Sequence, residues 1–158
     1  MNCSRSAQRP AELWTGFLAS AENAAHARHM LIEWLRALDW PAAAGEDIVL
    51  AVYEALANVV DHAYLARAHD EEDSTPGAAQ LYAWEAVDPS GDCRRVVAVV
   101  TDRGRWKPAL TGRRYRGRGL PMMAACMDEV HIQPSAGGTT VIMTSVPAPG
   151  PNSESAAE

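Results

Sequence analysis

Two stretches in the first half of the chain place apolar residues at helical spacing. The first runs from a cap at Ser20 or Asn23 to about Leu38, and the second from near Glu46 to about Ala66. The apolar face of the second stretch consists of Ile48, Val52, Ala55 and Val59. The pattern therefore predicts two consecutive amphipathic helices.

Shorter runs of branched, aromatic and other apolar residues predict strands. We expect one strand before the helices, at residues 13–18, and four after them, at residues 80–87, 94–101, 129–133 and 139–146. A short helix is expected at residues 120–127, with Pro121 in its first turn. The unbroken apolar run 96–100 is typical of a strand that is buried on both faces.

The order of these elements predicts the fold class. Consecutive strands in the second half favour a mixed, mostly antiparallel sheet with helices packed on one face, which is a two-layer α/β sandwich. The length of 158 residues fits one domain. We expect that domain at residues 12–147, with flexible tails at residues 1–11 and 148–158 because these segments lack apolar periodicity.

Charge and composition narrow the classes of function. The formal net charge of -6 argues against a dedicated nucleic-acid-binding protein. Residues 103–118, however, carry seven Arg or Lys and no acid, which indicates either a site for an anion such as a nucleotide or a solvated basic loop. The three cysteines show no paired or zinc-binding spacing, and no apolar run approaches transmembrane length. These features predict a cytoplasmic protein with free thiols and no membrane partner.

Polar residues interrupt the apolar sequence of the second helix. Glu54, Asn58 and His62 are four residues apart, which places a carboxylate, a carboxamide and an imidazole on one stripe. A Glu and an Asn on adjacent turns suit a base and a magnesium ligand in phosphoryl transfer. Taken alone, the stripe also fits another metal site, a buried polar network or an accident of sequence.

Three later segments carry weaker signals. Asp102 ends a predicted strand, where a carboxylate can bind a ligand amine but where a simple turn residue is also common. The sequence Gly117-Arg-Gly-Leu-Pro-Met opens the short helix, whose first N–H groups could bind an anion. Gly138 and Thr139 alone indicate only a hairpin. The sequence contains no P-loop and no Gly-x-Ser-x-Gly, so neither of those chemistries is predicted.

The joint order of these segments resembles that of the Bergerat-fold ATPases, which include gyrase, heat-shock chaperones, mismatch-repair ATPases and histidine kinases. The matching motifs are an N box, two glycine boxes and a closing Gly-Thr: Glu54-x-x-x-Asn58-x-x-x-His62, Asp102-Arg-Gly104, Gly117-Arg-Gly119-Leu120 and Gly138-Thr139. The similarity spans residues 13–146. Within this superfamily, residues 50–64 and 117–123 look most like the anti-sigma-factor serine kinases.

The resemblance implies a Bergerat sandwich with ATP and Mg²⁺ as cofactors. It implies that Asn58 holds Mg²⁺ and that Glu54 orients or deprotonates the attacking hydroxyl. Asp102 would accept a hydrogen bond from the adenine amino group, with Thr139 nearby. The other implied nucleotide-binding residues are Gly104, which lets the chain pass the base, and Gly117, Arg118, Gly119 and Leu120 at the phosphates. Residues 105–116 would form the lid.

The resemblance also implies a function and partners. It points to an anti-sigma factor with serine/threonine kinase activity, whose partners are a sigma factor and an anti-anti-sigma (STAS-type) protein. One departure is Trp106, at a position where the first glycine box often has a second glycine, beside a short lid. This departure favours an alternative, a nucleotide-sensing anti-sigma module without kinase activity. A third interpretation is the ATPase domain of a sensor histidine kinase.

A homodimer is a further implication of the resemblance, because members of the subgroup commonly dimerise. The first strand and first helix are the expected surface, with Arg28 as a candidate contact to a partner. No direct nucleic-acid partner is expected.

Overall fold

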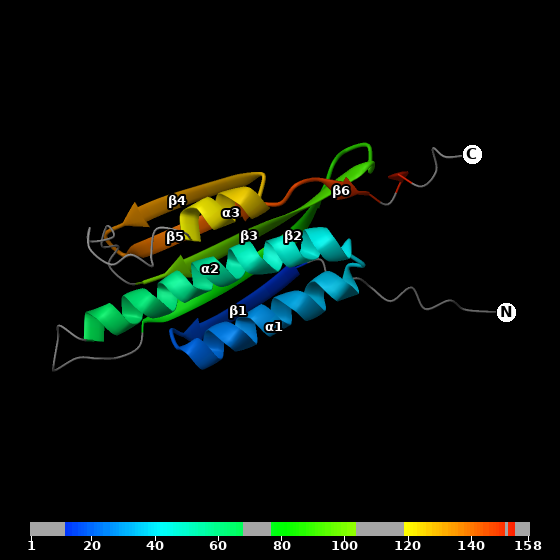
Figure 1. Ribbon diagram of the computed structural model, residues 1–158. Helices are drawn as coiled ribbons and strands as arrows, with labels where there is room; N and C mark the ends of the chain where they lie inside the picture. The colour runs from blue at the N-terminus through cyan, green and yellow to red at the C-terminus, as the bar shows by residue number, and fades with distance from the viewer. Residues whose placement is uncertain (1–11, 68–76, 104–118, 151, 154–158) are drawn as a thin grey trace.

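The computed structural model describes residues 12–67, 77–103, 119–150 and 152–153 (Figure 1). In chain order, its elements are β1 (Glu12–Leu18), α1 (Ala21–Ala37), α2 (Ala42–Arg67), β2 (Ala78–Val87), β3 (Cys93–Asp102), α3 (Gly119–Cys126), β4 (Glu129–Ser135), β5 (Gly138–Thr144) and β6 (Ala148–Pro149). Every helix and strand expected from the sequence is therefore present. In the part of the chain described here, no helix is both long enough and apolar enough to cross a membrane.

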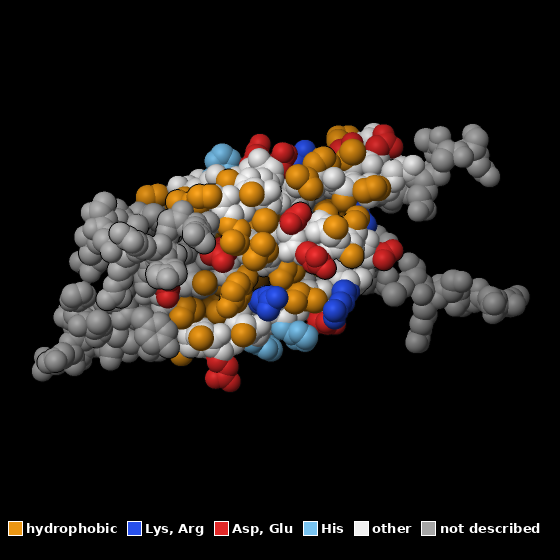
Figure 2. Space-filling view, viewed as in Figure 1, with side chains coloured by type: hydrophobic (Ala, Val, Ile, Leu, Met, Phe, Trp, Pro, Cys, Tyr) orange, Lys and Arg blue, Asp and Glu red, His pale blue; other side chains and the backbone are white. Residues whose placement is uncertain are grey.

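The strands form one sheet in the order β1-β2-β3-β5-β4, with β6 beside β3. All the strand pairs that the structure describes are antiparallel. The three helices lie together on one face of this sheet, which confirms the predicted two-layer α/β sandwich (Figure 1). Between the layers lies a core whose largest fully buried side chains include Leu31, Leu38, Ile48, Leu56, Leu81, Met123 and Met143. The outer surface of the helix layer is seen in Figure 2.

Helix α2 begins four residues earlier than expected. Its first turn is closed by the Gly45 backbone N–H, which donates to the Pro41 carbonyl at 2.8 Å. A proline can occupy this position because its missing N–H would have no partner within the helix. Gly45 is buried beside Trp40, since a Cβ added to Gly45 would lie 3.7 Å from the Trp40 ring. The glycine that looked like a break in the sequence is thus a packing position inside the helix.

The apolar run in β3 is not buried on both faces, so that expectation was wrong. Burial alternates along the strand: Val96, Ala98 and Val100 face the helices and are buried, whereas Val97 and Val99 are half-buried on the other side. We call this second side the open face of the sheet; it is defined by Trp14, Tyr82, Trp84, Val97, Val99 and Ile142, which are neighbours in the strand register. None of the described helices covers it.

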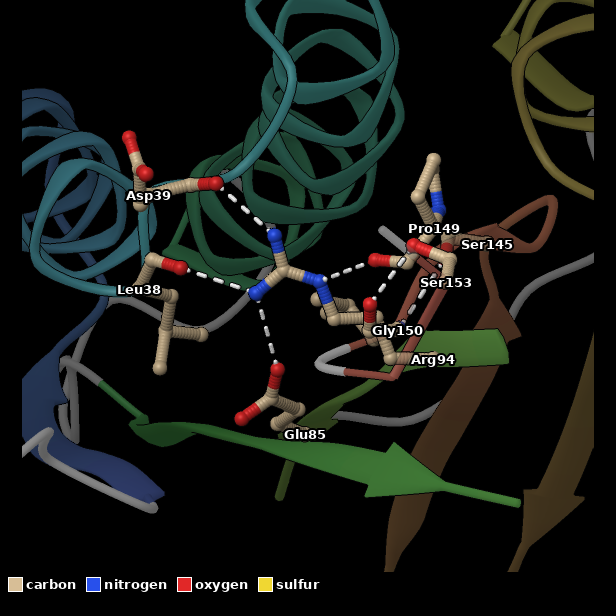
Figure 3. A network of polar contacts seen from close by, with 9 residues as sticks. Leu38, Asp39, Glu85, Arg94, Ser145, Pro149, Gly150 and Ser153 are labelled. Atoms are coloured by element: carbon tan, nitrogen blue, oxygen red, sulfur yellow. Dashed lines mark hydrogen bonds and ion pairs between the residues drawn. The ribbon is translucent and has the colours of Figure 1, made fainter. Parts of the chain in front are cut away.

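The C-terminal tail was predicted to begin at residue 148, but the structure places β6 in the sheet beside β3. Arg94 explains the difference. Its Nε donates to the Pro149 carbonyl at 2.9 Å, and its other nitrogens donate to the carbonyls of Leu38 and Asp39, each at 2.8 Å, and to Glu85 at 3.0 Å (Figure 3). One buried guanidinium thus joins the C-terminal segment, the end of α1 and the β2–β3 hairpin.

Candidate nucleotide site

Helix α2 brings Glu54 and Asn58 to the N-terminus of α3. Both side chains are half-buried. A Cβ added to Gly119, the first residue of α3, would lie 3.2 Å from Glu54 Oε2 and 3.8 Å from Asn58 Nδ2. The backbone at the start of α3 therefore passes directly beside the carboxylate and the carboxamide. Only a glycine leaves the Glu54 carboxylate in place here without a steric adjustment.

A second group of predicted residues lies where β3 and β5 pair. Asp102 and Thr139 are direct cross-strand partners, and both are buried. Within the described residues, the Thr139 hydroxyl has no hydrogen-bond partner. Buried hydroxyls usually have a partner, because an unpaired one costs about 1–3 kcal/mol. The Thr139 hydroxyl is therefore available to donate or accept a hydrogen bond next to Asp102.

Gly138 sets the close approach of these two strands. Its φ is +142°, and a Cβ at this position would lie 1.8 Å from the Asp102 carbonyl oxygen. No other residue fits this contact without moving the backbone. The glycine of the Gly-Thr pair thus places the Thr139 side chain next to the end of β3.

The two groups lie at the same end of the molecule. Figure 1 shows the C-terminal end of β3, the beginning of β5 and the N-terminus of α3 at one end of the sandwich. Leu120 follows Gly119, and its side chain is exposed. Three predicted site residues, Gly104, Gly117 and Arg118, lie outside the described residues, as do Trp106, the lid at residues 105–116 and the side chain of His62.

The described part of the chain holds no group of three or more His, Cys, Asp or Glu side chains that could bind a metal ion. Magnesium, however, does not require such a group, because it commonly takes one or two protein ligands together with phosphate oxygens and water. A single ligand such as Asn58 is therefore compatible with Mg²⁺ that arrives with a nucleotide.

Contacts between α2 and α3 continue beyond Gly119. Burial raises the pKa of the Cys126 thiol, and the nearby negative charge of Asp47 raises it further. The thiol therefore stays protonated near neutral pH. Cys126 acts as a packing residue at the end of α3, and no catalytic role is assigned to it.

The sequence interpretation missed Arg94 entirely. Arg94 is in phase with the buried positions Val96, Ala98 and Val100 of β3. An arginine at an inward-facing strand position indicates a buried cation, which must have several acceptors to be stable. The two-residue spacing of Arg94 from Val96, Ala98 and Val100 is therefore the feature of the sequence that could have predicted its burial.

Comparison with known proteins agrees with this architecture. Residues 17–145 match the family model described as the histidine kinase-like ATPase domain. The crystal structure of the RsbU and RsbW domains of Rv1364c from Mycobacterium tuberculosis is similar, with a TM-score of 0.63 and 29% sequence identity. The match covers 88% of this chain but only 33% of that one.

The fold is a two-layer α/β sandwich, and the two groups of polar residues lie at one end of its sheet. The chain belongs to the histidine kinase-like ATPase domain family, which the match over residues 17–145 shows. The predicted resemblance to the Bergerat-fold ATPases is thereby confirmed.

Proposed function

We propose that this protein binds ATP with Mg²⁺ and transfers the terminal phosphoryl group to a serine or threonine of an anti-anti-sigma (STAS-type) partner. In the same proposal it also binds a sigma factor, and so regulates transcription by partner switching in the cytoplasm. Membership of the histidine kinase-like ATPase domain family supports the proposed binding of ATP. The similarity to a chain that contains an RsbW domain agrees with the anti-sigma-factor kinase resemblance of the sequence.

The observation that carries this proposal is that Glu54 and Asn58 lie beside the space that a side chain at Gly119 would fill. Helix N-termini offer unpaired N–H groups to phosphate oxygens, and the absence of a side chain at Gly119 lets such an oxygen approach. A carboxamide and a carboxylate 3.8 Å and 3.2 Å from the Cβ position supply a metal ligand and a base at that point. This closeness supports the proposal that the backbone at Gly119 binds phosphate, with Asn58 as the metal ligand and Glu54 as the base beside it.

The buried pair Asp102 and Thr139 supports an adenine site. An adenine ring offers one amino group and ring nitrogens, which a carboxylate acceptor and a hydroxyl can pair with. The unused Thr139 hydroxyl would gain a partner when a base occupies this position. A polar ligand group therefore fits the end of β3 better than an apolar one does.

The residues of this chain would bind and orient the reactants. When bound, ATP would supply the phosphoryl group and Mg²⁺ would neutralise part of the charge on its phosphates. Asn58 would hold the metal, and Glu54 would accept the proton of the substrate hydroxyl. General-base catalysis of this kind contributes about 10²–10⁴-fold.

The test compares ATP affinity and phosphate transfer in matched variants. We expect Asn58→Ala to weaken Mg²⁺-dependent ATP binding at least tenfold in calorimetry. Glu54→Gln should keep ATP affinity within about threefold and lower γ-phosphate transfer to the STAS-type partner by about 100-fold or more. Asp47→Asn, which removes an exposed acid from the same helix, is the control. Transfer at the wild-type rate by Glu54→Gln would refute the assigned base.

A nucleotide-sensing module without kinase activity is the second candidate. The observation that favours it is Trp106, a bulky residue where the related first glycine box often has glycine. In this case wild-type protein would bind ATP and a sigma factor but transfer no phosphate to any STAS-type protein. Measuring affinity and transfer on one sample separates the two candidates.

We also propose a homodimer through the first strand and helix. β1 is an edge strand, and its Trp14 side chain is 63% exposed on the open face of the sheet. Unpaired strand edges and exposed aromatic residues both favour association. Sedimentation should therefore show a dimer that Trp14→Asp dissociates, whereas Val87→Asp, an exposed apolar position elsewhere on the sheet, leaves it intact. A wild-type monomer at high concentration would exclude this dimer.

A further inference from the structure

The last part of the chain that the structure describes lies along the turn between β2 and β3. We call it the strap; it comprises residues 148–150 and 152–153. The Gly150 backbone N–H donates to the Asp92 carbonyl at 2.8 Å, and the Asn152 backbone N–H donates to the Gly91 carbonyl at 3.0 Å. The strap is thus attached to the sheet by hydrogen bonds to the backbone of one turn, next to the short pairing of β6 with β3.

Little apolar surface holds the strap in place. The side chain of Ala148 is buried, whereas Pro149 and Asn152 are exposed. Burial of one alanine stabilises a fold much less than burial of a leucine or a methionine does. Segments with few buried apolar contacts are the first to open in local unfolding. The strap can therefore detach at a much lower cost in free energy than any strand in the centre of the sheet.

The strap also completes the surroundings of a buried cation. Arg94 is only 8% exposed, and its Nε donates to the Pro149 carbonyl of the strap. The two other nitrogens of the guanidinium donate to the carbonyls of Leu38 and Asp39 (Figure 3). These two residues begin the connection between α1 and α2, which we call the α1–α2 corner and define as residues 38–41. One guanidinium thus joins the strap to the corner.

The α1–α2 corner contains a residue in an unfavourable conformation. Asp39 has a φ of +53°, in the left-handed region that residues other than glycine rarely adopt. Such a conformation persists where surrounding contacts fix it. Arg94 provides two of these contacts, because it donates to the Asp39 carbonyl at 2.8 Å and lies over the Trp40 ring, 4.8 Å from its centroid. Loss of these contacts would let the corner relax.

We propose that the strap is detachable, and that its release loosens the α1–α2 corner while the opposite end of the sandwich stays folded. With the strap in place, Arg94 is shielded from water, and hydrogen bonds in such low-dielectric surroundings are strong. Once the strap leaves, water reaches the guanidinium and competes for it with the carbonyls of Leu38 and Asp39. The corner then loses an attachment to the sheet, and Asp39 leaves its strained conformation.

This device lies far from the proposed nucleotide site. Arg94 and Asp102 are near opposite ends of β3. Figure 1 shows β6 and the α1–α2 corner at the end of the sandwich that is remote from the N-terminus of α3. Any event that removes the strap would therefore reach the end of α1 and the start of α2 first. The proposal does not rest on ATP binding or on phosphate transfer.

Hydrogen exchange of single backbone amides, followed by NMR on the intact chain, tests the proposal. In Gly150→Ala the new Cβ would lie 2.3 Å from the Gly91 carbonyl oxygen, so the strap cannot keep its place. We expect the Asp39 and Trp40 amides, both hydrogen-bonded to α1, to exchange about tenfold faster or more. The Ala19 amide, which is hydrogen-bonded beside the other end of α1, should change less than about threefold.

Two side-chain variants of the strap complement this test. Asn152→Ala removes a hydrogen bond from the strap to the β2–β3 turn and should accelerate exchange at Trp40 by about threefold. Ser153→Ala is the matched control, because its hydroxyl donates to the Gly150 carbonyl within the strap. It should leave exchange at Trp40 as in wild type.

A third variant tests the route through Asp39. Asp39→Gly removes the backbone strain, since glycine adopts a positive φ without a steric penalty. The corner should then keep its conformation without the help of Arg94. In the Asp39→Gly background, Gly150→Ala should therefore accelerate exchange at Trp40 by less than about threefold.

Four results would overturn the proposal. Slow exchange of the Asn152 amide in Gly150→Ala would show that the strap does not detach. Wild-type exchange at Trp40 with the strap detached would show that the strap does not hold the corner. Equal acceleration at Trp40 and Ala19 would show that the whole fold loosens together. An undiminished effect of Gly150→Ala in the Asp39→Gly background would exclude the route through the strained residue.

Discussion

Asp102 and Thr139 are direct partners across the β3–β5 strand pair, and their side chains are only 7% and 3% exposed. Among the described residues the Thr139 hydroxyl has no hydrogen-bond partner, and a buried hydroxyl without one is unfavourable unless a ligand pairs with it. The pairing also depends on Gly138, which lets the two backbones approach. The adenine end of the proposed site is therefore built into the sheet, whereas its phosphate end is built by two helices.

Removing the Thr139 hydroxyl should increase the stability of the fold and weaken ATP binding. Thr139→Val keeps the shape of the side chain and eliminates a buried hydroxyl that has no partner in the described part of the chain. We expect the free energy of unfolding to rise by about 1 kcal/mol, and ATP to bind about tenfold more weakly. Chemical denaturation and calorimetry on the same samples measure both. Thr140→Val, whose hydroxyl lies 3.5 Å from that of Thr101, is the control and should bind ATP normally.

Adding one methyl group at the start of α3 should disturb the proposed base. In Gly119→Ala the new Cβ would lie 3.2 Å from Glu54 Oε2, so the carboxylate must shift by a few tenths of an ångström. Because the carboxylate is the far end of a flexible side chain, the melting temperature should change little. Phosphate transfer should fall about tenfold or more, since small displacements of catalytic groups are costly. Gly77→Ala, where no atom lies within 4 Å of the added Cβ, should leave transfer unchanged.

Gly138→Ala should act on folding instead. The Cβ would meet the Asp102 carbonyl oxygen at 1.8 Å, at a φ of +142° that other residues rarely adopt. The contact involves two backbones, so no side chain can move aside. We expect a loss of about 3 kcal/mol or more in the free energy of unfolding. The neighbouring Gly137→Ala provides the control, because its nearest atom is 4.0 Å away; equal losses in the two variants would contradict the steric argument.

Periodicity and turn residues predicted the helices and strands here because they are local properties of the sequence. The spacing of Glu54 and Asn58 was visible for the same reason. Contacts between distant segments could not be predicted in this way. No local feature of the sequence indicates that Gly119 lies beside Glu54, or that Thr139 lies opposite Asp102.

The start of the predicted C-terminal tail, at residues 148–150, lies in the sheet or beside it for a related reason. Its Pro, Gly and Ser content is typical of a flexible segment, but long-range contacts hold its described part: β6 pairs with β3, the Gly150 N–H donates to the Asp92 carbonyl at 2.8 Å, and Arg94 binds the Pro149 carbonyl. The guanidinium of Arg94 lies 55 residues from the carbonyl of Pro149 in sequence and 2.9 Å from it in space. Composition indicates how a segment behaves in isolation. It does not reveal that Arg94 donates a hydrogen bond to the Pro149 carbonyl.

Arg94 should therefore not be replaceable by lysine. Four acceptors surround its planar guanidinium, which also lies over the Trp40 ring at 4.8 Å. A lysine has three donors on one nitrogen and cannot reach these acceptors from the same position. We expect Arg94→Lys to lower the free energy of unfolding by about 2–4 kcal/mol, measured by denaturant titration. Arg95→Lys, on the more exposed neighbouring position, should cost under about 1 kcal/mol.

The β2–β3 turn should make stability depend on pH in the acid range. The Cys93 backbone N–H and the Ser90 hydroxyl donate to the Asp88 carboxylate, and these bonds lower its pKa in the folded protein. Because the folded pKa is the lower one, the charged carboxylate stabilises the fold at pH values above its unfolded pKa, near 4. That contribution is lost as the pH falls through the folded pKa. Asp88→Asn, which cannot ionise, should melt at a lower temperature than wild type at pH 7, and the difference should shrink as the pH is lowered from 5 to 3. A difference that is constant over this range would show that Asp88 does not act through its charge.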